Sequence, residues 1–233
     1  MEGTINLKIL MARKNMWLVN ITKRLLDILI SLIVLVFFAP FYGLIAIAIK
    51  HDSPGPVFYR GLRIGYKKKF FKILKFRTMY ETEQSYLGPK VTAQDDPRIT
   101  PLGHWLRDTK LNEFPQFWNV LIGEMSLVGP RPCIPYEFED YAPWHKRRCE
   151  GLPGLTGLWQ VEGKNHTTFD EMVRLDIRYL SRQSPWLDLK IMFKTLPAIL
   201  VQYRETRQKQ KGEAAQAPIH ESEGRWPEQA APV

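Results

Sequence analysis

The most hydrophobic part of the chain is residues 28–49, a run of 22 positions without a charged side chain. A helix of this length is long enough to cross a hydrocarbon core of about 30 Å. The run begins later and is longer than the apolar region of a signal peptide, which has about 7–15 residues. We therefore predict a membrane segment that stays in the mature protein.

Basic residues flank this run on both sides, and Pro40 lies near its middle. Because Lys and Arg favour the cytoplasmic face, both ends are expected on that face. Proline removes one backbone hydrogen bond and kinks a helix. The pattern predicts a re-entrant membrane helix over residues 20–50 that breaks at Pro40, with a straight single span as the alternative. The flanking residues are Arg13, Lys14, Lys23 and Arg24 before the run, and Lys50, Arg60, Arg63 and 67–69 after it.

In residues 51–203, turn-forming residues separate short segments whose apolar residues have the spacing of a helix or a strand. Turn residues at 52–56 precede an apolar and aromatic stretch with two glycines, which predicts a small hairpin. Helical spacing of Phe114, Phe117, Trp118 and Leu121 predicts an apolar helix face, with Pro115 in the first turn. Asn112 is a favourable N-cap for that helix.

A final helix is expected from Ser184, where serine and proline form a typical helix start. This helix is either interfacial or an ordinary core helix. Beyond Tyr203 the chain is polar and aperiodic, which predicts a disordered tail. We thus expect an N-terminal tail (1–19), the membrane helix (20–50), a folded domain (51–203) and a disordered tail (204–233).

Charge and composition narrow the range of partners. The chain has 233 residues, enough for one core, and a formal charge of +9. Residues 60–77 contain eight basic and no acidic side chains beside the membrane segment, which favours lipid headgroups or phosphates. The sequence has no recognisable nucleic-acid-binding module, so a nucleic-acid partner is not predicted. Two cysteines are too few for a disulfide framework and suit a reducing compartment.

The candidate catalytic and phosphate-binding residues are concentrated between positions 107 and 132. Arg131 lies between two prolines that restrict the backbone, and its guanidinium fork is suited to a phosphate, with a rigid turn that carries an exposed arginine as the alternative. Glu113, expected at a helix N-terminus, suits a nucleophile or a magnesium ligand, although an ordinary first-turn glutamate is equally common. The sequence contains no Gly-rich phosphate loop, zinc spacing or nucleophile elbow.

Two adjoining segments, KLNEFPQFWNV (110–120) and GEMSLVGPRP (123–132), resemble the bacterial sugar transferase family. These are the monotopic phosphoglycosyl transferases that act on undecaprenyl phosphate. The resemblance covers roughly residues 20–200. Further matching motifs are Lys23-Arg24 with Asp27, Lys75-Phe76-Arg77-Thr78-Met79, Asp96-Pro97-Arg98, Pro153-Gly154-Leu155-Thr156-Gly157 and Asp188-Leu189-Lys190-Ile191.

The resemblance implies a mixed, mostly helical α/β fold: a re-entrant helix, a small cytoplasmic catalytic domain and interfacial helices at the bacterial inner membrane. It also implies Mg²⁺ and an Asp-Glu pair, in which the Asp attacks the β-phosphate of a UDP-sugar. UMP leaves, and the polyprenyl phosphate lipid then takes the phosphosugar. Such a step would initiate exopolysaccharide, capsule, O-antigen or glycoprotein glycan assembly. The sugar and the oligomeric state stay open.

The sequence departs from the family pattern where the nucleophilic aspartate is expected, because that position holds Asn112. Three explanations remain: Glu113 attacks instead, Glu113 acts as base or metal ligand in a direct transfer, or the protein is an impaired scaffold or regulator. We favour Glu113, with Asp108 as a weaker substitute. A second departure is Ala39 before Pro40, where relatives can carry serine.

Other site residues follow from matching positions. The resemblance implies phosphate or donor contacts for Arg107, Arg131 and Lys164. It places Lys75 and Arg77 near the same basic cleft. Each of the five has an alternative role as a structural ion pair.

Overall fold

The structure, a computed structural model, describes residues 2–82, 96–163 and 167–216. Its N-terminal part is a bent helix pair, α1 (Glu2–Phe37) and α2 (Ala39–Asp52). The two helices meet at a 60° bend, and Pro40 lies in the first turn of α2. Proline is tolerated there because the first N–H groups of a helix have no intrahelical partner. The long helix is thus broken beside Pro40, and its re-entry into a membrane stays a prediction.

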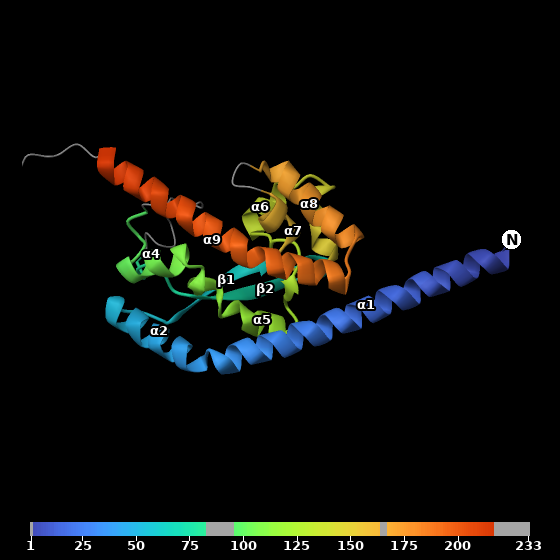
Figure 1. Ribbon diagram of the computed structural model, residues 1–233, viewed down its shortest axis with the longest axis horizontal. Coiled ribbons are helices and arrows are strands. Elements are labelled where there is room, and N and C mark those ends of the chain that lie inside the picture. The colour runs from blue at the N-terminus through green and yellow to red at the C-terminus, as the bar shows by residue number, and fades with distance from the viewer. Residues whose placement is uncertain (1, 83–95, 164–166, 217–233) are drawn as a thin grey trace, which may run out of the picture.

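Helix α1 begins at Glu2, inside the segment expected to be an N-terminal tail, and its first turns project beyond the body of the protein (Figure 1). In the described part of the chain no single helix is long and apolar enough to span a membrane. Val19–Phe37 and Ala39–Asp52 pass that test of length and composition only when they are taken together.

Two small sheets form the centre of the domain. Strands β1 (Phe58–Ile64) and β2 (Phe70–Phe76) pair antiparallel around a 3-10 turn, which confirms the predicted hairpin. Strands β3 (Ser126–Val128) and β4 (Gly154–Thr156) pair parallel.

Helices surround these sheets, so the expectation of a mixed and mostly helical α/β fold is confirmed. The α-helices are α4 (Pro101–Asp108), α5 (Gln116–Ile122), α6 (Pro135–Glu139), α7 (Leu158–Glu162), α8 (Phe169–Ser181) and α9 (Pro185–Gln216). The 3-10 helices are η1 (Tyr66–Lys68), η2 (Leu111–Glu113) and η3 (His145–Glu150). The main core lies where β2, α5, β3, α8 and α9 meet, around Val120, Met125 and Tyr179.

Helix α9 begins as predicted, because the Oγ of Ser184 accepts a hydrogen bond from the N–H of Leu187 at 3.2 Å. The helix continues to Gln216, so residues 204–216, expected to be disordered, are helical in the structure. Lys, Gln, Glu and Ala dominate this stretch and are strong helix formers. Residues 217–233 of the predicted tail lie outside the described part.

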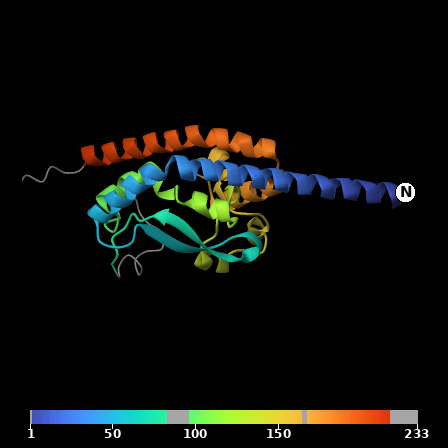
Figure 2. The same ribbon diagram turned by 90° about the horizontal axis from the view of Figure 1, so that it is seen from below.

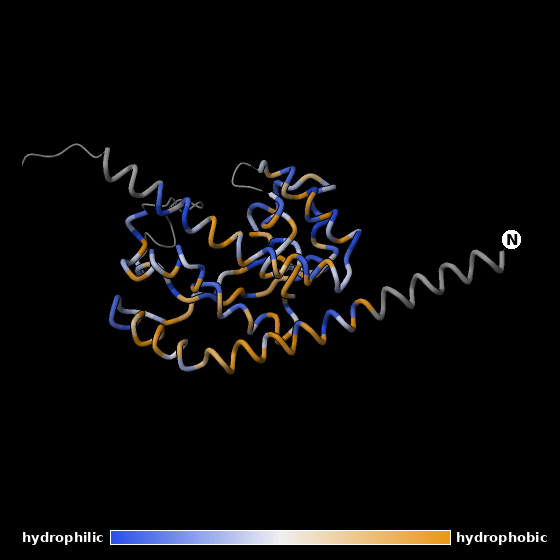
Figure 3. The backbone as a smooth tube through the Cα atoms, viewed as in Figure 1, coloured by the Kyte–Doolittle hydropathy of each residue, from blue (hydrophilic) through white to orange (hydrophobic). Residues whose placement is uncertain are grey.

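Many of the exposed large apolar side chains lie on α1, α2 and α9. Helices α1 and α9 run along the same side of the domain, with the β1–β2 hairpin on the other (Figure 2). Apolar residues dominate α2 and the half of α1 that precedes it (Figure 3). We call this surface the apolar face; it comprises the exposed residues Leu25, Leu29, Leu32, Ile33, Val36, Phe37, Leu44, Ile47, Trp186, Phe193, Leu196, Leu200 and Val201.

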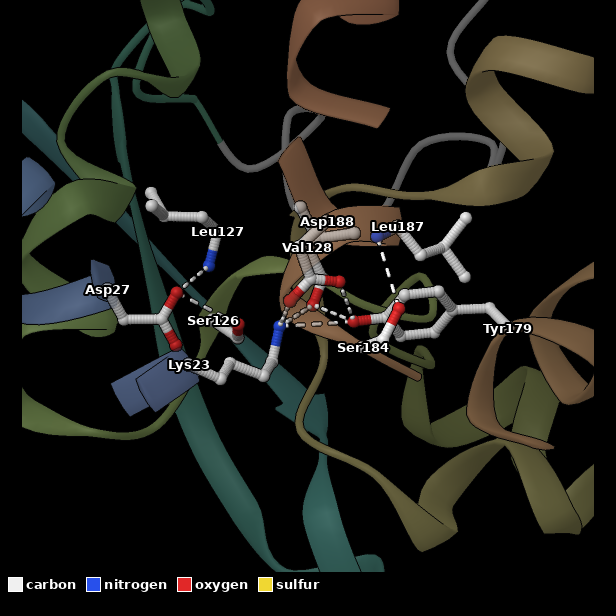
Figure 4. A network of polar contacts seen from close by, with 9 residues as sticks. All are labelled: Lys23, Asp27, Ser126, Leu127, Val128, Tyr179, Ser184, Leu187 and Asp188. Atoms are coloured by element: carbon white, nitrogen blue, oxygen red, sulfur yellow. Dashed lines mark hydrogen bonds and ion pairs between the residues drawn. The ribbon is translucent and has the colours of Figure 1, made fainter. Parts of the chain in front are cut away.

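A buried ion pair joins α1 to the body beneath this face (Figure 4). The Nζ of Lys23 lies 2.8 Å from the Oδ2 of Asp188 and donates to the carbonyl of Val128 at 2.8 Å. The Tyr179 hydroxyl donates to the other Asp188 oxygen at 2.7 Å. One turn along α1, Asp27 accepts the N–H of Leu127 at 2.9 Å. These contacts fix α1 against β3 and α9.

Candidate active site

The segment around Asn112 differs from the predicted helix start. Lys110 adopts a left-handed conformation (φ 61°), η2 follows, and α5 begins only at Gln116. Pro115 therefore precedes α5 directly and does not lie within its first turn. Pro115 keeps helical φ and ψ (−60° and −16°) but has no N–H to donate, so the single helix expected from the spacing is divided into η2 and α5.

The buried side of α5 also differs from the expected apolar face. Trp118 is 50% exposed, whereas Gln116 and Asn119 are buried. The Asn119 amide accepts the N–H of Leu74 at 2.9 Å and donates to the carbonyl of Lys72 at 2.9 Å. Asn119 thus fixes α5 to β2, a role that the local pattern did not indicate.

The centre of the site is an ion pair between η2 and β2. The Nζ of Lys75 lies 2.7 Å from the Oε1 of Glu113, and the two side chains are 23% and 35% exposed. Burial raises the pKa of Glu113, but Lys75 lowers it by charge and hydrogen bond, and Lys110 and Arg131 lower it further. The net pKa is below its ordinary value. Glu113 is thus an ionised carboxylate with partial access to solvent.

Arg131 is exposed, and its charge acts on this carboxylate. Its guanidinium carbon lies 6.0 Å from the ring centre of Trp159, within range of a cation–π contact. Before it, the N–H of Gly129 donates to Thr156 at 2.9 Å, and a Cβ on Gly129 would lie 2.3 Å from the carbonyl oxygen of Leu152. The loop is therefore held against β4, in agreement with the rigidity expected from its prolines.

A fully buried ion pair lies beside the same loop, and no local pattern indicated it. Arg148 of η3 donates to the carboxylate of Asp176 on α8. Burial raises the pKa of Asp176 to about 6, while Arg148 and the main-chain N–H of Arg131 act to lower it. Removing either partner would leave a buried charge uncompensated.

Arg107 belongs to a different group of polar side chains. Its Nε donates to the Oγ1 of Thr78 at 2.8 Å. Asp96 and Arg98 form an ion pair close enough for both charges to affect the pKa of Arg107. A hydrogen bond from Arg98 lowers the pKa of Asp96 to about 2. The predicted contact residues therefore divide between the Glu113 ion pair and this second group.

The guanidinium of Arg77 has a structural position that does not match the predicted phosphate contact. It is buried and donates to the carbonyls of Ser53 at 2.7 Å, Ile49 at 3.3 Å and Pro54. These carbonyls lie at and just beyond the end of α2, where a helix lacks hydrogen-bond donors. Arg77 thus caps α2. Lys164 lies outside the described residues.

We expect Arg77→Gln to lower the free energy of unfolding by about 1–3 kcal/mol, because it leaves buried carbonyls without their donor. Thermal unfolding of the purified protein in detergent measures the change. Arg60→Gln, which removes an exposed arginine from β1, is the matched control. Equal unfolding temperatures for the two variants would contradict the capping role.

Two amide groups beside Glu113 are buried without a hydrogen-bond partner among the described residues: the Oδ1 of Asn112 and the Nε2 of Gln116. Mg²⁺ binds hard oxygen ligands and is commonly held by one or two protein groups together with phosphate and water. The Glu113 carboxylate and the adjacent Asn112 oxygen suit such a donor set. Within the described ranges no group of three or more His, Cys, Asp or Glu residues forms a metal cage.

A comparison with protein families shows to which family the chain belongs. The bacterial sugar transferase model matches residues 18–202. The chain belongs to the bacterial sugar transferase family. The matched region includes the C-terminal half of α1, the Glu113 ion pair, the Arg131 loop and the Lys23 ion pair. The prediction of a sugar transferase, and hence of an enzyme, is confirmed.

Relatives in this family are about 40% identical to the chain over the aligned residues. Galactosyl transferase CpsE of Streptococcus agalactiae is 40% identical over 78% of this chain and 41% of its own length. Exopolysaccharide production protein ExoY of Sinorhizobium fredii is 39% identical over 77% of this chain and 86% of its own. A UDP-glucose:undecaprenyl-phosphate glucose-1-phosphate transferase of Caulobacter vibrioides is 41% identical over 78% and 71%. The chain spans less than half of CpsE but most of ExoY.

Proposed function

We propose that this sugar transferase moves a sugar 1-phosphate from a UDP-sugar to undecaprenyl phosphate and releases UMP. The names of its relatives support this class of reaction, and several of them denote glucose or galactose phosphotransferases. The reaction would begin assembly of exopolysaccharide, capsule, O-antigen or a glycoprotein glycan.

The observation that carries the proposal is an ionised, partly exposed carboxylate next to cationic side chains. A nucleotide diphosphate and a lipid phosphate are both polyanions, so a carboxylate can approach them only where positive charge offsets the repulsion. Lys75 and Arg131 supply that charge around Glu113.

In the proposed reaction a Glu113 oxygen attacks the β-phosphorus of the donor. The bond from that phosphorus to UMP breaks, and UMP leaves with the electron pair. An oxygen of undecaprenyl phosphate then attacks the same phosphorus and releases the Glu113 carboxylate. Dividing the transfer in this way means that only one phosphate partner has to be positioned at a time. Lys75 would exchange its bond to Glu113 for one to a phosphate oxygen.

Asn112 is not suited to the attack, since its amide is neutral and its oxygen is buried. It would instead support the adjacent Mg²⁺ site with Glu113. Mg²⁺, when bound, would offset phosphate charge. Direct transfer with Glu113 as base or metal ligand is the alternative within the same site.

Incubation of the purified protein with undecaprenyl phosphate, Mg²⁺ and a panel of UDP-sugars tests the function. We expect UMP release with at least one donor and its loss when EDTA removes the metal. UDP-glucose and UDP-galactose are the first donors to test, given the names of the relatives. No UMP from any donor would favour the alternative, a catalytically impaired membrane scaffold or regulator of the same fold.

Arg131→Lys is expected to lower kcat/KM for the donor about 10- to 100-fold, because lysine keeps the charge but loses the planar fork that binds phosphate through two hydrogen bonds. The rate of UMP release over a range of donor concentrations measures the effect. Arg147→Lys, at an exposed position of η3, is the matched control. Equal kcat/KM values for the two variants would exclude Arg131 as a phosphate contact.

The membrane arrangement is also a proposal. The apolar face and the 60° bend support a helix pair that enters the cytoplasmic side of the inner membrane and returns to it, with α9 in the interface. The catalytic domain would then face the cytoplasm.

Cysteines introduced at Lys14 and Lys50, in a background with Cys133 and Cys149 replaced by serine, test this topology. We expect a membrane-impermeant thiol reagent to label both positions from the same side of sealed vesicles. Labelling from opposite sides would support a straight span instead.

A further inference from the structure

The two cysteines of the chain are in contact beneath the Arg131 loop. The Sγ atoms of Cys133 and Cys149 lie 3.7 Å apart, and both residues are buried, with 2% and 5% of their surface exposed. Both thiols are free. The proposed transfer reaction uses neither of them.

Their neighbours connect the pair to the phosphate-binding loop. Cys133 follows Arg131 by two residues, and its main chain exchanges two hydrogen bonds with Ile64 at the end of β1, at 2.9 and 3.1 Å. Cys149 follows Arg148, which binds Asp176, and the Arg131 N–H acts on that carboxylate. The contact between the two thiols therefore lies between the Arg131 loop and η3, the two segments that position Arg131.

The surroundings distinguish the two sulfur atoms chemically. A hydrogen bond from Cys149 and the charge of Arg148 lower the pKa of Cys133 below its ordinary value, although burial opposes them. The pKa of Cys149 is raised by its hydrogen bond to Cys133 and by burial. Because the thiolate is the reactive form, Cys133 is the sulfur that reacts first and Cys149 is the resolving thiol.

We propose that Cys133 and Cys149 form an oxidation site at which a peroxide closes a disulfide and thereby lowers transferase activity. The Cys133 thiolate attacks one peroxide oxygen, the O–O bond breaks, and sulfenic acid and one water form after proton uptake. The Cys149 sulfur then attacks the sulfenic sulfur, forms the S–S bond and releases the second water. The two thiols lose two electrons, and the peroxide is reduced to water.

Closure must bring the sulfur atoms about 1.7 Å closer, since a disulfide bond is about 2.05 Å long. Cys133 is held by Ile64 on one side and continues into Pro132 and Arg131 on the other, so the movement reaches the loop or η3. A misplacement of about 1 Å at a substrate-positioning residue can cost on the order of 100-fold in rate. We expect at least a tenfold fall in kcat/KM for the donor.

The effect on activity rests on the proposed function, whereas disulfide formation does not, so two measurements separate them. The full-length protein in detergent is treated with hydrogen peroxide, and remaining thiols are alkylated after denaturation. Mass spectrometry should then show a peptide that links Cys133 to Cys149. UMP release should fall and recover with dithiothreitol. The variants Cys133→Ser and Cys149→Ser are the controls, because they cannot form the disulfide but retain every methionine. In these variants peroxide should cause no loss of UMP release that dithiothreitol reverses.

Hydrogen exchange of residues 129–133 provides a readout that needs no turnover. We expect the disulfide to change exchange in this loop and dithiothreitol to reverse the change. Full alkylation of both cysteines after peroxide would overturn the oxidation site. A linked peptide with unchanged exchange and unchanged UMP release would overturn the coupling to Arg131. If the untreated protein releases no UMP, the transfer proposal fails, and the linked peptide and loop exchange still decide the oxidation site.

Discussion

Glu113→Gln is expected to reduce UMP release by on the order of 1,000-fold or more, because the amide can neither attack phosphorus nor act as a base. The substitution keeps the shape of the side chain and removes one negative charge. Lys75 would lose its ionic partner, but this partly exposed pair contributes little to stability, roughly 0–1 kcal/mol. The unfolding temperature should therefore stay close to that of the unmodified protein.

The measurement is UMP release from the best UDP-sugar in the presence of Mg²⁺ and undecaprenyl phosphate. Glu139→Gln removes the same charge from an exposed position at the end of α6 and is the matched control. Glu139→Gln should retain full activity. A Glu113→Gln variant as active as this control would refute the assignment and leave Asp108 as the next carboxylate to test.

Lys23→Gln is expected to lower the free energy of unfolding by about 3–5 kcal/mol, because it leaves the buried Asp188 carboxylate without its charged partner. The Tyr179 hydroxyl would remain as a donor, but it carries no compensating charge. An effect of this size corresponds to a fall of roughly 10 °C or more in unfolding temperature for a domain of this length.

Circular dichroism of the protein in detergent during heating measures this change. Lys190→Gln, at an exposed position on α9, removes a lysine from the same region and should change the unfolding temperature by little. A double variant, Lys23→Met with Asp188→Leu, should be less destabilised than Lys23→Gln, since no unpaired charge remains. Equal effects of Lys23→Gln and Lys190→Gln would show that the ion pair contributes little.

The features that the sequence predicted correctly depend on neighbouring residues. Pro40 lies at the break of the long apolar helix, and Ser184 caps α9. In each case the decisive atoms lie within a few positions of one another, so a local pattern is sufficient. The family motifs additionally indicated Glu113 and Arg131 as site residues, and these roles stay predictions.

The features that the sequence missed depend on distant partners. Arg77 binds carbonyls 23–28 positions earlier, a pairing that no local spacing reveals. Asn119 is buried because it binds β2, 45 and 47 positions away, whereas its spacing in α5 gives it no special place. Arg148 meets Asp176 across 28 positions. Such contacts become visible only when the fold brings the segments together.

In the proposed membrane arrangement, the attachment of α1 to the body would determine how the protein responds to its lipid surroundings. Lys23 is held by Asp188 and Val128, and Arg24 donates to the last carbonyls of α5, at Val120 and Leu121. These contacts hold α1 and the catalytic domain together as one unit. A thicker or thinner bilayer would then move both together, so the height of the Glu113 carboxylate above the acyl chains would follow the depth at which Pro40 lies.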